Sequence, residues 1–352
     1  MKTFDFVRPL SLADAVAAAS GPGAAYLAGG TNLLDLMKGG IARPDRLVDI
    51  SGIPDLDLIE RLPDGGYRIG ALVRNADLAH EPDFARAFPA VAEALLSGAS
   101  PQLRNAASVG GNLLQRTRCG YFYDPASACN KRSPGSGCDA RGGENRLHAV
   151  LGWSDSCIAT HPSDFCIPLV ALDAVVEIQG KSGRREIALE ELHALPGNTP
   201  ERETRLETGD LIVAIRLPGA AAAYSGHSRY LKLRERTSYA FAVVSAAAAL
   251  DIDDGRIRQG RLALGGVAPR PWRAREAEAV LTNAAPGDDT FRRAAEAALA
   301  DARPSGDNAF KIELAKRIVA RSLALAAAGT PERLPALPAS PFSTNPRVHH
   351  AA

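Results

Sequence analysis

Short blocks of apolar residues, separated by turn signals, open the chain and predict a small unit of strands and helices. The helix signal is clearest where Ser11, a good N-cap residue, precedes an alanine-rich run. The elements predicted by this pattern are strands at 3–7, 25–28 and 47–50 and helices at 12–19 and 33–38. We expect this first unit to end near Leu58.

The middle of the chain combines regular elements with one long stretch that lacks periodicity. Strands are expected at 67–70, 174–178 and 210–215, and a helix at about 84–96. Residues 116–163 show neither helical nor strand periodicity. A structureless loop of this length is unusual in a compact domain unless it has a function. We therefore expect a bound group to organise it.

The last third predicts a further unit with its own small sheet. Pro218 and the small residues 219–223 suggest a linker before it. Strands are expected at 229–233, 243–252 and 261–264, and helices at 274–281, 291–300 and 309–328. Residues 330–352 hold five prolines and no periodicity, so we expect a disordered tail or an arm that orders on a partner.

Composition narrows the function classes. The 352 residues are 46% hydrophobic and 23% charged, as in soluble globular proteins, and the net charge of +1 gives no general attraction to nucleic acid or anionic membranes. The apolar runs are too short to span a membrane. Residues 1–5 lack the order of a signal peptide, so export by a signal of its own is not expected.

Four of the five cysteines lie in the aperiodic stretch. Cys119, Cys129, Cys138 and Cys157 are separated by nine, eight and eighteen residues. Without a Cys-x-x-Cys pair, this spacing disfavours zinc fingers and the common ferredoxin patterns. Spacing alone leaves three alternatives, which are an iron–sulfur cluster, a zinc ion and unliganded thiols. Cys166 opens an apolar run and is interpreted as a buried structural thiol.

Basic residues flank these thiols, namely Arg116, Arg118, Lys131 and Arg132. They would offset the negative charge of a thiolate cluster, or they form a solvated basic loop.

Two glycine turns have the character of phosphate sites. Residues 26–33 run from a predicted strand through Gly29-Gly30 into a helix start, and residues 108–112 form a second Gly-Gly turn. Bare backbone N–H groups in such turns can approach a phosphate closely. Neither turn is the Gly-x-Gly-x-x-Gly dinucleotide fingerprint. The two turns together could hold both phosphates of one dinucleotide.

Taken in order, five motifs resemble the FAD-binding subunit of the molybdenum hydroxylases, the xanthine dehydrogenase and aldehyde oxidoreductase family. They are Ala28-Gly29-Gly30-Thr31-Asn32-Leu33, residues 108–112, Pro162-Ser163-Asp164, residues 210–217 and residues 230–236. The resemblance extends from Phe4 to about Leu325.

The resemblance implies an α+β fold with two domains. A two-lobed, vanillyl-alcohol-oxidase-like (PCMH-type) FAD-binding domain would occupy residues 1–220, with lobes at about 1–58 and 59–220. A C-terminal α+β domain like that of the CO dehydrogenase flavoprotein would occupy 225–328, followed by a proline-rich tail at 329–352.

The resemblance also implies an FAD site between the lobes and no catalytic residue in this chain. The two glycine turns would cradle the pyrophosphate, Asp164 would bind the ribitol or ribose region, and Ile212 and Lys232 would lie near the isoalloxazine ring. The implied cofactor-binding residues are Tyr26, Leu27, Ala28, Gly29, Gly30, Thr31, Asn32, Leu33, Ser108, Gly111, Asn112, Asp164, Ile212 and Lys232.

One departure from the family pattern carries further information. In most members the Asp164 element follows the second glycine turn almost at once, whereas here 51 residues separate Asn112 from Asp164. This insertion, about 113–163, resembles bacterial periplasmic aldehyde oxidoreductases whose FAD subunit carries an additional [4Fe–4S] cluster. The implied ligands are Cys119, Cys129, Cys138 and Cys157.

The resemblance thus implies an electron-transfer subunit of a heterotrimeric molybdenum-dependent aldehyde oxidoreductase. A molybdenum-cofactor large subunit would oxidise the aldehyde, and a [2Fe–2S] small subunit would pass electrons to the FAD. The resemblance implies a periplasmic location, reached by co-export with a signal-bearing partner, with the cytoplasm as the alternative. Two other functions stay open, which are the flavin subunit of a 4-hydroxybenzoyl-CoA-reductase-like enzyme and a zinc-stabilised binding protein.

Overall fold

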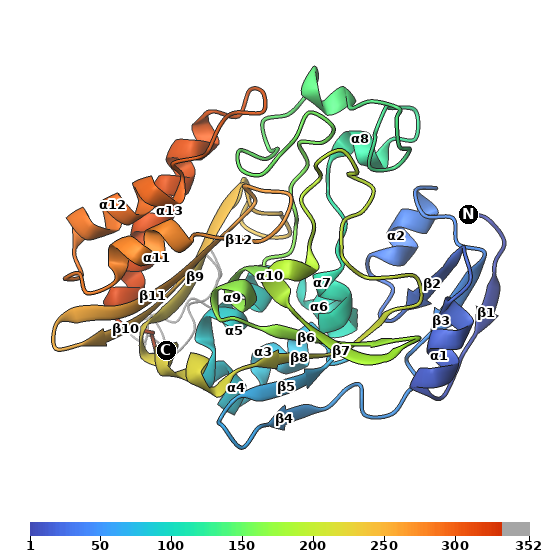
Figure 1. The fold of residues 1–352 in the computed structure, drawn as a ribbon, viewed down its shortest axis with the longest axis horizontal. Coiled ribbons are helices and arrows are strands. Elements are labelled where there is room, and N and C mark those ends of the chain that lie inside the picture. The colour runs from blue at the N-terminus through green and yellow to red at the C-terminus, as the bar shows by residue number, and fades with distance from the viewer. Residues whose placement is uncertain (333–352) are drawn as a thin grey trace, which may run out of the picture.

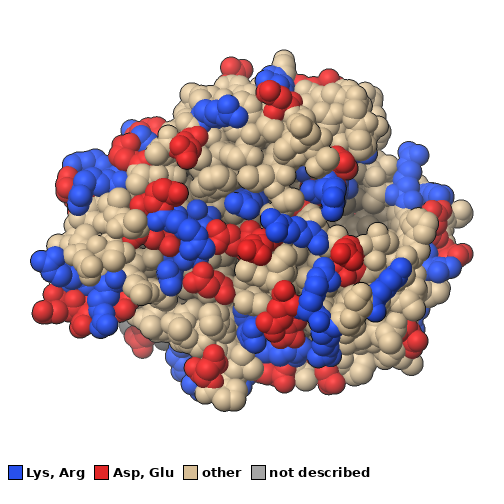
Figure 2. Space-filling view, in the orientation of Figure 1, with Lys and Arg blue, Asp and Glu red and all other residues tan. Residues whose placement is uncertain are grey.

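The computed structural model describes residues 1–332 and arranges them around three β-sheets (Figure 1). Positive and negative side chains are interspersed over the face drawn in Figure 2, in keeping with the small net charge. Within residues 1–332, no helix is long and apolar enough to cross a membrane.

The first sheet is parallel and has the strand order β1-β3-β2. Its elements are β1 (Asp5–Val7), α1 (Leu12–Ala19), β2 (Ala24–Leu27), α2 (Leu33–Lys38) and β3 (Arg46–Asp49). Ser11 caps α1 as predicted, because its side chain accepts a hydrogen bond from the Asp14 N–H. Ala15 and Val48 share a core with Leu211 and Val213 of the next sheet, which joins the two lobes.

The second sheet is antiparallel and has the order β4-β5-β8-β6-β7. Its strands are β4 (Ile59–Arg61), β5 (Tyr67–Gly70), β6 (Val175–Gly180), β7 (Gly183–Ala188) and β8 (Leu211–Leu217). The helices of this part are α3 (Asn75–His80), α4 (Pro82–Ala87), α5 (Pro89–Ser97), α6 (Pro101–Ala106), α7 (Val109–Leu113), α9 (Cys166–Ala171) and α10 (Leu189–Leu192).

The single helix predicted at 84–96 is wrong, because the chain forms two helices there. Phe88 leaves the helical conformation at φ −132° and ψ 62°, and Pro89 then begins α5. Proline has no N–H to continue a helix and restricts the residue before it, so it starts a new helix instead.

The third sheet is antiparallel with the order β12-β11-β10-β9 and is covered by three helices. Its elements are β9 (Ser228–Leu233), β10 (Val244–Asp253), β11 (Arg256–Gly265), β12 (Trp272–Arg273), α11 (Arg275–Leu281), α12 (Asp288–Ala298) and α13 (Phe310–Ala327). Residues 219–223, predicted as a linker, belong to the 3₁₀ helix η2 (Gly219–His227).

Strand β10 is buried on both of its faces. Ala246, Ala248 and Leu250 face the core beneath the C-terminal helices, whereas Ala247 and Ala249 belong to the core of the second sheet. Because side chains alternate across a strand, this one strand fastens the C-terminal domain to the rest of the molecule.

The long segment of residues 113–163 (hereafter the insert) runs along one side of the molecule, drawn in green in Figure 1. It contains the short helix α8 (Gly120–Tyr123), the 3₁₀ turn η1 (Asp139–Arg141) and two isolated bridges, Cys129–Cys138 and Ser154–Cys157. The absence of long elements agrees with the sequence. Most of the predicted tail, residues 333–352, lies outside the described residues.

Candidate functional site

A cavity of about 1090 Å³, hereafter the central cavity, lies where all parts of the molecule meet. Thr31 and Asn32 line it from the first lobe, and Asn112 and Asp164 from the second. The C-terminal domain and the insert also contribute to the wall, through Lys232, Phe241, Arg118, Cys119 and His148. Its size suits a large cofactor.

The first glycine turn packs against the backbone just before the second. A Cβ on Gly29 would lie 1.9 Å from the Ala106 carbonyl oxygen, so only glycine fits there. Gly30 has φ +71°, a conformation that other residues rarely adopt. The close contact between Gly29 and Ala106 therefore brings the two glycine turns together, and their role as a pyrophosphate cradle stays a prediction.

The second glycine turn is held by side-chain hydrogen bonds. The Ser108 Oγ caps α7 by accepting from the Gly111 N–H at 3.3 Å. The Asn112 Oδ1 accepts from the Ser163 hydroxyl at 2.7 Å and from Gln115 Nε2 at 2.6 Å. These bonds orient the Asn112 amide at the cavity wall and tie the turn to Pro162-Ser163-Asp164 across the whole insert.

Asp164 and Lys232 form a buried ion pair at the cavity wall. The Lys232 Nζ donates to Asp164 Oδ2 at 2.7 Å, and the Tyr230 hydroxyl donates to Oδ1 at 2.6 Å. Both side chains of the ion pair are less than one tenth exposed. Burial, and then the Asp164 charge, raise the pKa of Tyr230 well above its usual value, so this hydroxyl remains a donor. Tyr230 belongs to the motif at residues 230–236, but only the structure shows that its hydroxyl donates to Asp164.

The other predicted cofactor residues do not line the cavity, and these include Gly29, Gly30, Ser108 and Gly111 of the glycine turns. Ile212 is buried in β8 opposite Ile178, beside a bulge in the β6–β8 pairing. The Tyr26 hydroxyl donates to the Gly209 carbonyl at 2.7 Å, which joins the first lobe to the start of β8. Leu27 ends β2, Ala28 packs against the core of the first lobe and Leu33 begins α2. Their contribution to cofactor binding stays a prediction.

The structure places the four cysteines of the insert, all free thiols, close enough to one another to interact electrostatically. Cys129 and Cys138 pair across an antiparallel bridge, and the Cys119 Sγ lies 3.2 Å from His148 Nε2. A charge on Cys129 would raise the pKa of each of the other three thiols, so Cys129 lies within electrostatic range of them all. Burial is the larger cause and raises the pKa of Cys119 to about 11. Burial therefore favours the neutral form of Cys119, Cys138 and Cys157.

The basic residues around the thiols act mainly as anchors. Lys131 is buried and donates to the Pro200 carbonyl and Glu203, and its charge lowers the pKa of Cys157. Arg132 donates to the carbonyls of Tyr121, Phe122, Pro125 and Ser127, which closes the loop around α8. A freely solvated basic loop therefore does not describe this segment.

The C-terminal domain holds the insert through a fully buried lysine. The Lys311 Nζ donates to the carbonyls of Leu147 (2.9 Å), His148 (2.8 Å) and Gly266 (2.6 Å). The Asn308 Nδ2 donates to the carbonyls of His148 and Ala149. Neither His148 nor Lys311 lies in a sequence motif, so the local pattern predicted no role for either.

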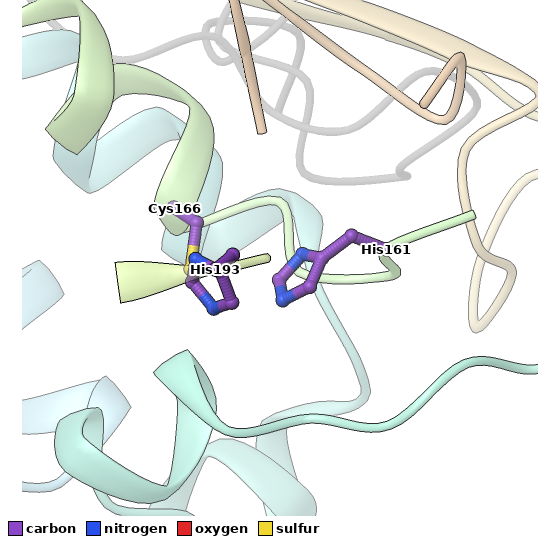
Figure 3. A group of neighbouring side chains, drawn as sticks. All are labelled: His161, Cys166 and His193. Atoms are coloured by element: carbon purple, nitrogen blue, oxygen red, sulfur yellow. The ribbon is translucent and has the colours of Figure 1, made fainter. Parts of the chain in front are cut away.

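A second group of possible metal ligands lies behind the second glycine turn, where the ligand atoms of His161, Cys166 and His193 are within 4.8 Å of one another (Figure 3). The imidazole rings pack edge-on with centroids 4.4 Å apart. His161 Nδ1 accepts from the Ser163 N–H, and His193 Nε2 donates to the Leu113 carbonyl.

Burial lowers the pKa of His193 to about 4 and raises that of Cys166 to about 12. The imidazole rings are therefore neutral, and the thiol keeps its proton unless a ligand displaces it, as is also the case for the buried thiols of the insert.

Comparison with known proteins identifies relatives over nearly the whole chain. Residues 2–220 match the FAD binding domain in molybdopterin dehydrogenase, and residues 229–326 match the CO dehydrogenase flavoprotein C-terminal domain. The chain is 49% identical to the aldehyde oxidoreductase FAD-binding subunit PaoB of Escherichia coli, over 93% of this chain and 99% of that protein.

Solved structures agree with the sequence matches. Carbon monoxide dehydrogenase from Hydrogenophaga pseudoflava superposes with a TM-score of 0.72 at 29% identity, covering 92% of this chain and 97% of that one. The enzyme from Oligotropha carboxidovorans gives 0.73 at 26% identity, covering 93% and 99%. The predicted fold, an FAD-binding domain followed by a CO-dehydrogenase-flavoprotein-like domain, is confirmed.

Proposed function

Because this chain belongs to the FAD-binding subunits of the molybdenum hydroxylases, we propose that it is the electron-transfer flavoprotein of a heterotrimeric aldehyde oxidoreductase. Aldehyde is proposed as the substrate class because the chain is 49% identical to an aldehyde oxidoreductase subunit, over nearly the full length of both proteins. Relatives such as xanthine and carbon monoxide dehydrogenase subunits are only 28–29% identical.

In the proposed complex, a molybdenum-cofactor large subunit converts aldehyde and water to carboxylic acid, releasing two electrons and two protons. A [2Fe–2S] small subunit passes the electrons to this chain, and they leave for an external acceptor. FAD, when bound, can take both electrons and release them singly. The protein supplies the cavity, the glycine turns and the Asp164–Lys232 pair at its wall, where the lysine keeps a cation close to the cofactor.

We further propose that Cys119, Cys129, Cys138 and Cys157 hold a [4Fe–4S] cluster. The grouping of four free thiols in a segment without a core of its own supports this assignment. Cys119 also lines the central cavity, so a cluster there would lie beside the flavin. Metal binding would displace the thiol protons that burial otherwise retains.

The test is to purify the full chain and record its spectrum and metal content. We expect flavin absorbance together with iron–sulfur absorbance and about four iron atoms per chain, as the cluster type requires. Stoichiometric zinc without flavin would instead indicate the zinc-stabilised binding protein. The complex assembled with its partners should then oxidise benzaldehyde-type substrates. Activity only as an aromatic-CoA reductase would support the 4-hydroxybenzoyl-CoA-reductase-like alternative.

For location, we propose the periplasm, reached together with a partner that carries an export signal. The proposal follows from the resemblance of the insert to that of the periplasmic aldehyde oxidoreductases. Cell fractionation with and without the partner genes tests it, and a flavoprotein found only in the cytoplasm in both cases would contradict it.

A further inference from the structure

We propose that Arg118, a residue of the insert, binds the pyrophosphate of FAD. The proposal rests on FAD occupying the central cavity, and it assigns to the insert a direct part in flavin binding, separate from any part in holding a cluster. Three features of Arg118 carry it, which are its position, its rigidity and its charge.

Position comes first. Arg118 lines the central cavity next to Thr31 and Asn32, the residues that follow the first glycine turn. Its Nη2 donates to Asn32 Oδ1 at 2.5 Å. The insert therefore reaches across the cavity to the same turn that supplies backbone N–H groups for the pyrophosphate.

The guanidinium group is fixed in this position. Its central carbon lies 4.8 Å from the Phe241 ring centroid and 5.8 Å from that of Tyr123. The Nη1 donates to the Tyr123 hydroxyl at 2.8 Å. The side chain is one quarter exposed, and its buried Nε has no acceptor in the described structure. The cation is thus preorganised at the cavity wall.

The charge of Arg118 also suits this position. A pyrophosphate carries two negative charges, whose burial needs compensation, and a planar guanidinium is well suited to phosphate oxygens. Among the cations that line the cavity within residues 1–332, Lys232 is paired with Asp164 and Arg146 with Glu235.

The remaining cations on the wall have other partners. Arg104 donates to the carbonyls of Leu96 and Gly98, and Arg236 to that of Tyr239. The carboxylate nearest Arg118 is Asp35, at 3.3 Å and more than half exposed, so it neutralises the guanidinium only weakly. Arg104 and Arg236 also keep their charge, because carbonyl acceptors do not neutralise it. Arg118 differs from them by its contact with Asn32, directly after the first glycine turn.

The experiment uses the full chain stripped of flavin and titrated with FAD, ADP and riboflavin. The variants are Arg118→Ala and Arg118→Lys, with Arg116→Ala as the matched control. Arg116 is two residues away, lies over Phe122 and pairs with Glu203, but does not line the central cavity. Iron content and circular dichroism are measured on every variant to check folding.

We expect Arg118→Ala to weaken FAD and ADP binding by about tenfold or more, the size of one lost charge-assisted contact. Riboflavin, which has no phosphate, should bind as in the wild type. Arg118→Lys should recover part of the FAD affinity, and Arg116→Ala should bind FAD normally. The loss should shrink as salt concentration rises.

Two results would overturn the proposal. Unchanged FAD affinity in Arg118→Ala would show that Arg118 does not bind the pyrophosphate. An equal loss for riboflavin and FAD would mean that Arg118 only maintains the shape of the cavity. A wild-type chain that binds none of the three ligands would instead contradict the FAD site itself. If Arg118→Ala does not fold, Arg118→Gln, which keeps the planar stacking group, decides between these outcomes.

Discussion

The insert and the C-terminal domain lie side by side, yet they keep their shapes in different ways. The C-terminal sheet alternates buried apolar residues, such as Leu262 and Leu264 of β11, beneath three helices. The insert has only a small apolar cluster around Phe122 and Cys129. Its order comes from side chains that bond to backbone carbonyls, as Arg132 and Lys311 do.

This difference teaches that a segment without its own core can be fixed by its surroundings. Backbone polar groups that lose water must find partners, and the insert finds them in cationic and amide side chains from other elements. Such a segment should respond to loss of a ligand or a single anchor, whereas the C-terminal domain should respond to loss of apolar volume. Four experiments can test this contrast.

The largest effect is expected from the thiols. Replacing Cys119, Cys129, Cys138 or Cys157 by Ser should abolish the cluster, because each would supply one of four iron ligands. Cys166→Ser should keep it, since Cys166 is fully buried at the start of α9. Iron quantitation on the five variants measures this. Full iron in Cys157→Ser would refute the ligand set, and an unfolded C-terminal domain in any of the four would refute the contrast between the regions.

The next effect concerns the buried anchor between the two regions. Lys311→Met keeps the length of the side chain but removes three hydrogen bonds, and the carbonyls of Leu147 and Gly266 lose their side-chain donor while that of His148 keeps Asn308. We expect the free energy of unfolding to fall by about 3 kcal/mol or more. Hydrogen exchange should accelerate at residues 145–151 before it does in β10.

The matched control for this anchor is Lys316→Met. Lys316 lies on the same helix but is partly exposed and paired with Glu296, so its loss should change stability by less than about 1 kcal/mol. Equal effects of the two substitutions in urea unfolding would show that Lys311 does not hold the insert.

The third effect is a dependence of stability on pH through the buried His193, which donates a hydrogen bond to the first residue of the insert, Leu113. The folded chain keeps His193 neutral down to about pH 4, whereas an unfolded histidine takes up a proton near its usual value of 6.5. The unfolded state therefore binds more protons between pH 6.5 and 4, and stability falls as the pH drops through this range. The slope is at most about 1.4 kcal/mol per pH unit for this proton.

His193→Gln should flatten that slope while keeping a donor for the Leu113 carbonyl. Urea unfolding at pH 7, 6, 5 and 4 measures it in both proteins. Parallel curves for wild type and variant would mean that His193 does not contribute. Above pH 6.5 the stabilisation from this group is fully present, so a slope confined to higher pH would also contradict the assignment.

The smallest effect should come from His148, which contacts the sulfur of Cys119 at 3.2 Å. A hydrogen bond to a ligand sulfur favours the reduced, more negative cluster. His148→Leu should lower the cluster potential by about 60 mV, equivalent to about 1.4 kcal/mol for one electron. His148→Gln, which keeps an N–H donor, should recover part of the shift in an EPR-monitored titration. Equal potentials in all three proteins would show that the contact is only packing.

Local sequence determined much of this molecule. Helices α1 and α2 begin and end where the pattern predicts, because apolar periodicity acts over a few neighbouring positions and, in α1, Ser11 caps the first turn. The sequence also predicts the glycine turn at 29–30. Gly30 has a positive φ there, and Gly29 has no room for a Cβ. The concentration of thiols in an aperiodic segment predicts a bound group from the order of residues alone, and this stays a prediction.

Only the tertiary structure decided which distant residues meet. Nothing in the local pattern joins Lys311 to His148, Tyr230 to Asp164 or Arg118 to Asn32, because each pair depends on where separate elements pack. A buried lysine or arginine in a sequence is indistinguishable from an exposed one until its partners are known. The sequence therefore determined the elements and the chemistry carried by the insert, and the packing of three sheets around one cavity decided what that chemistry touches.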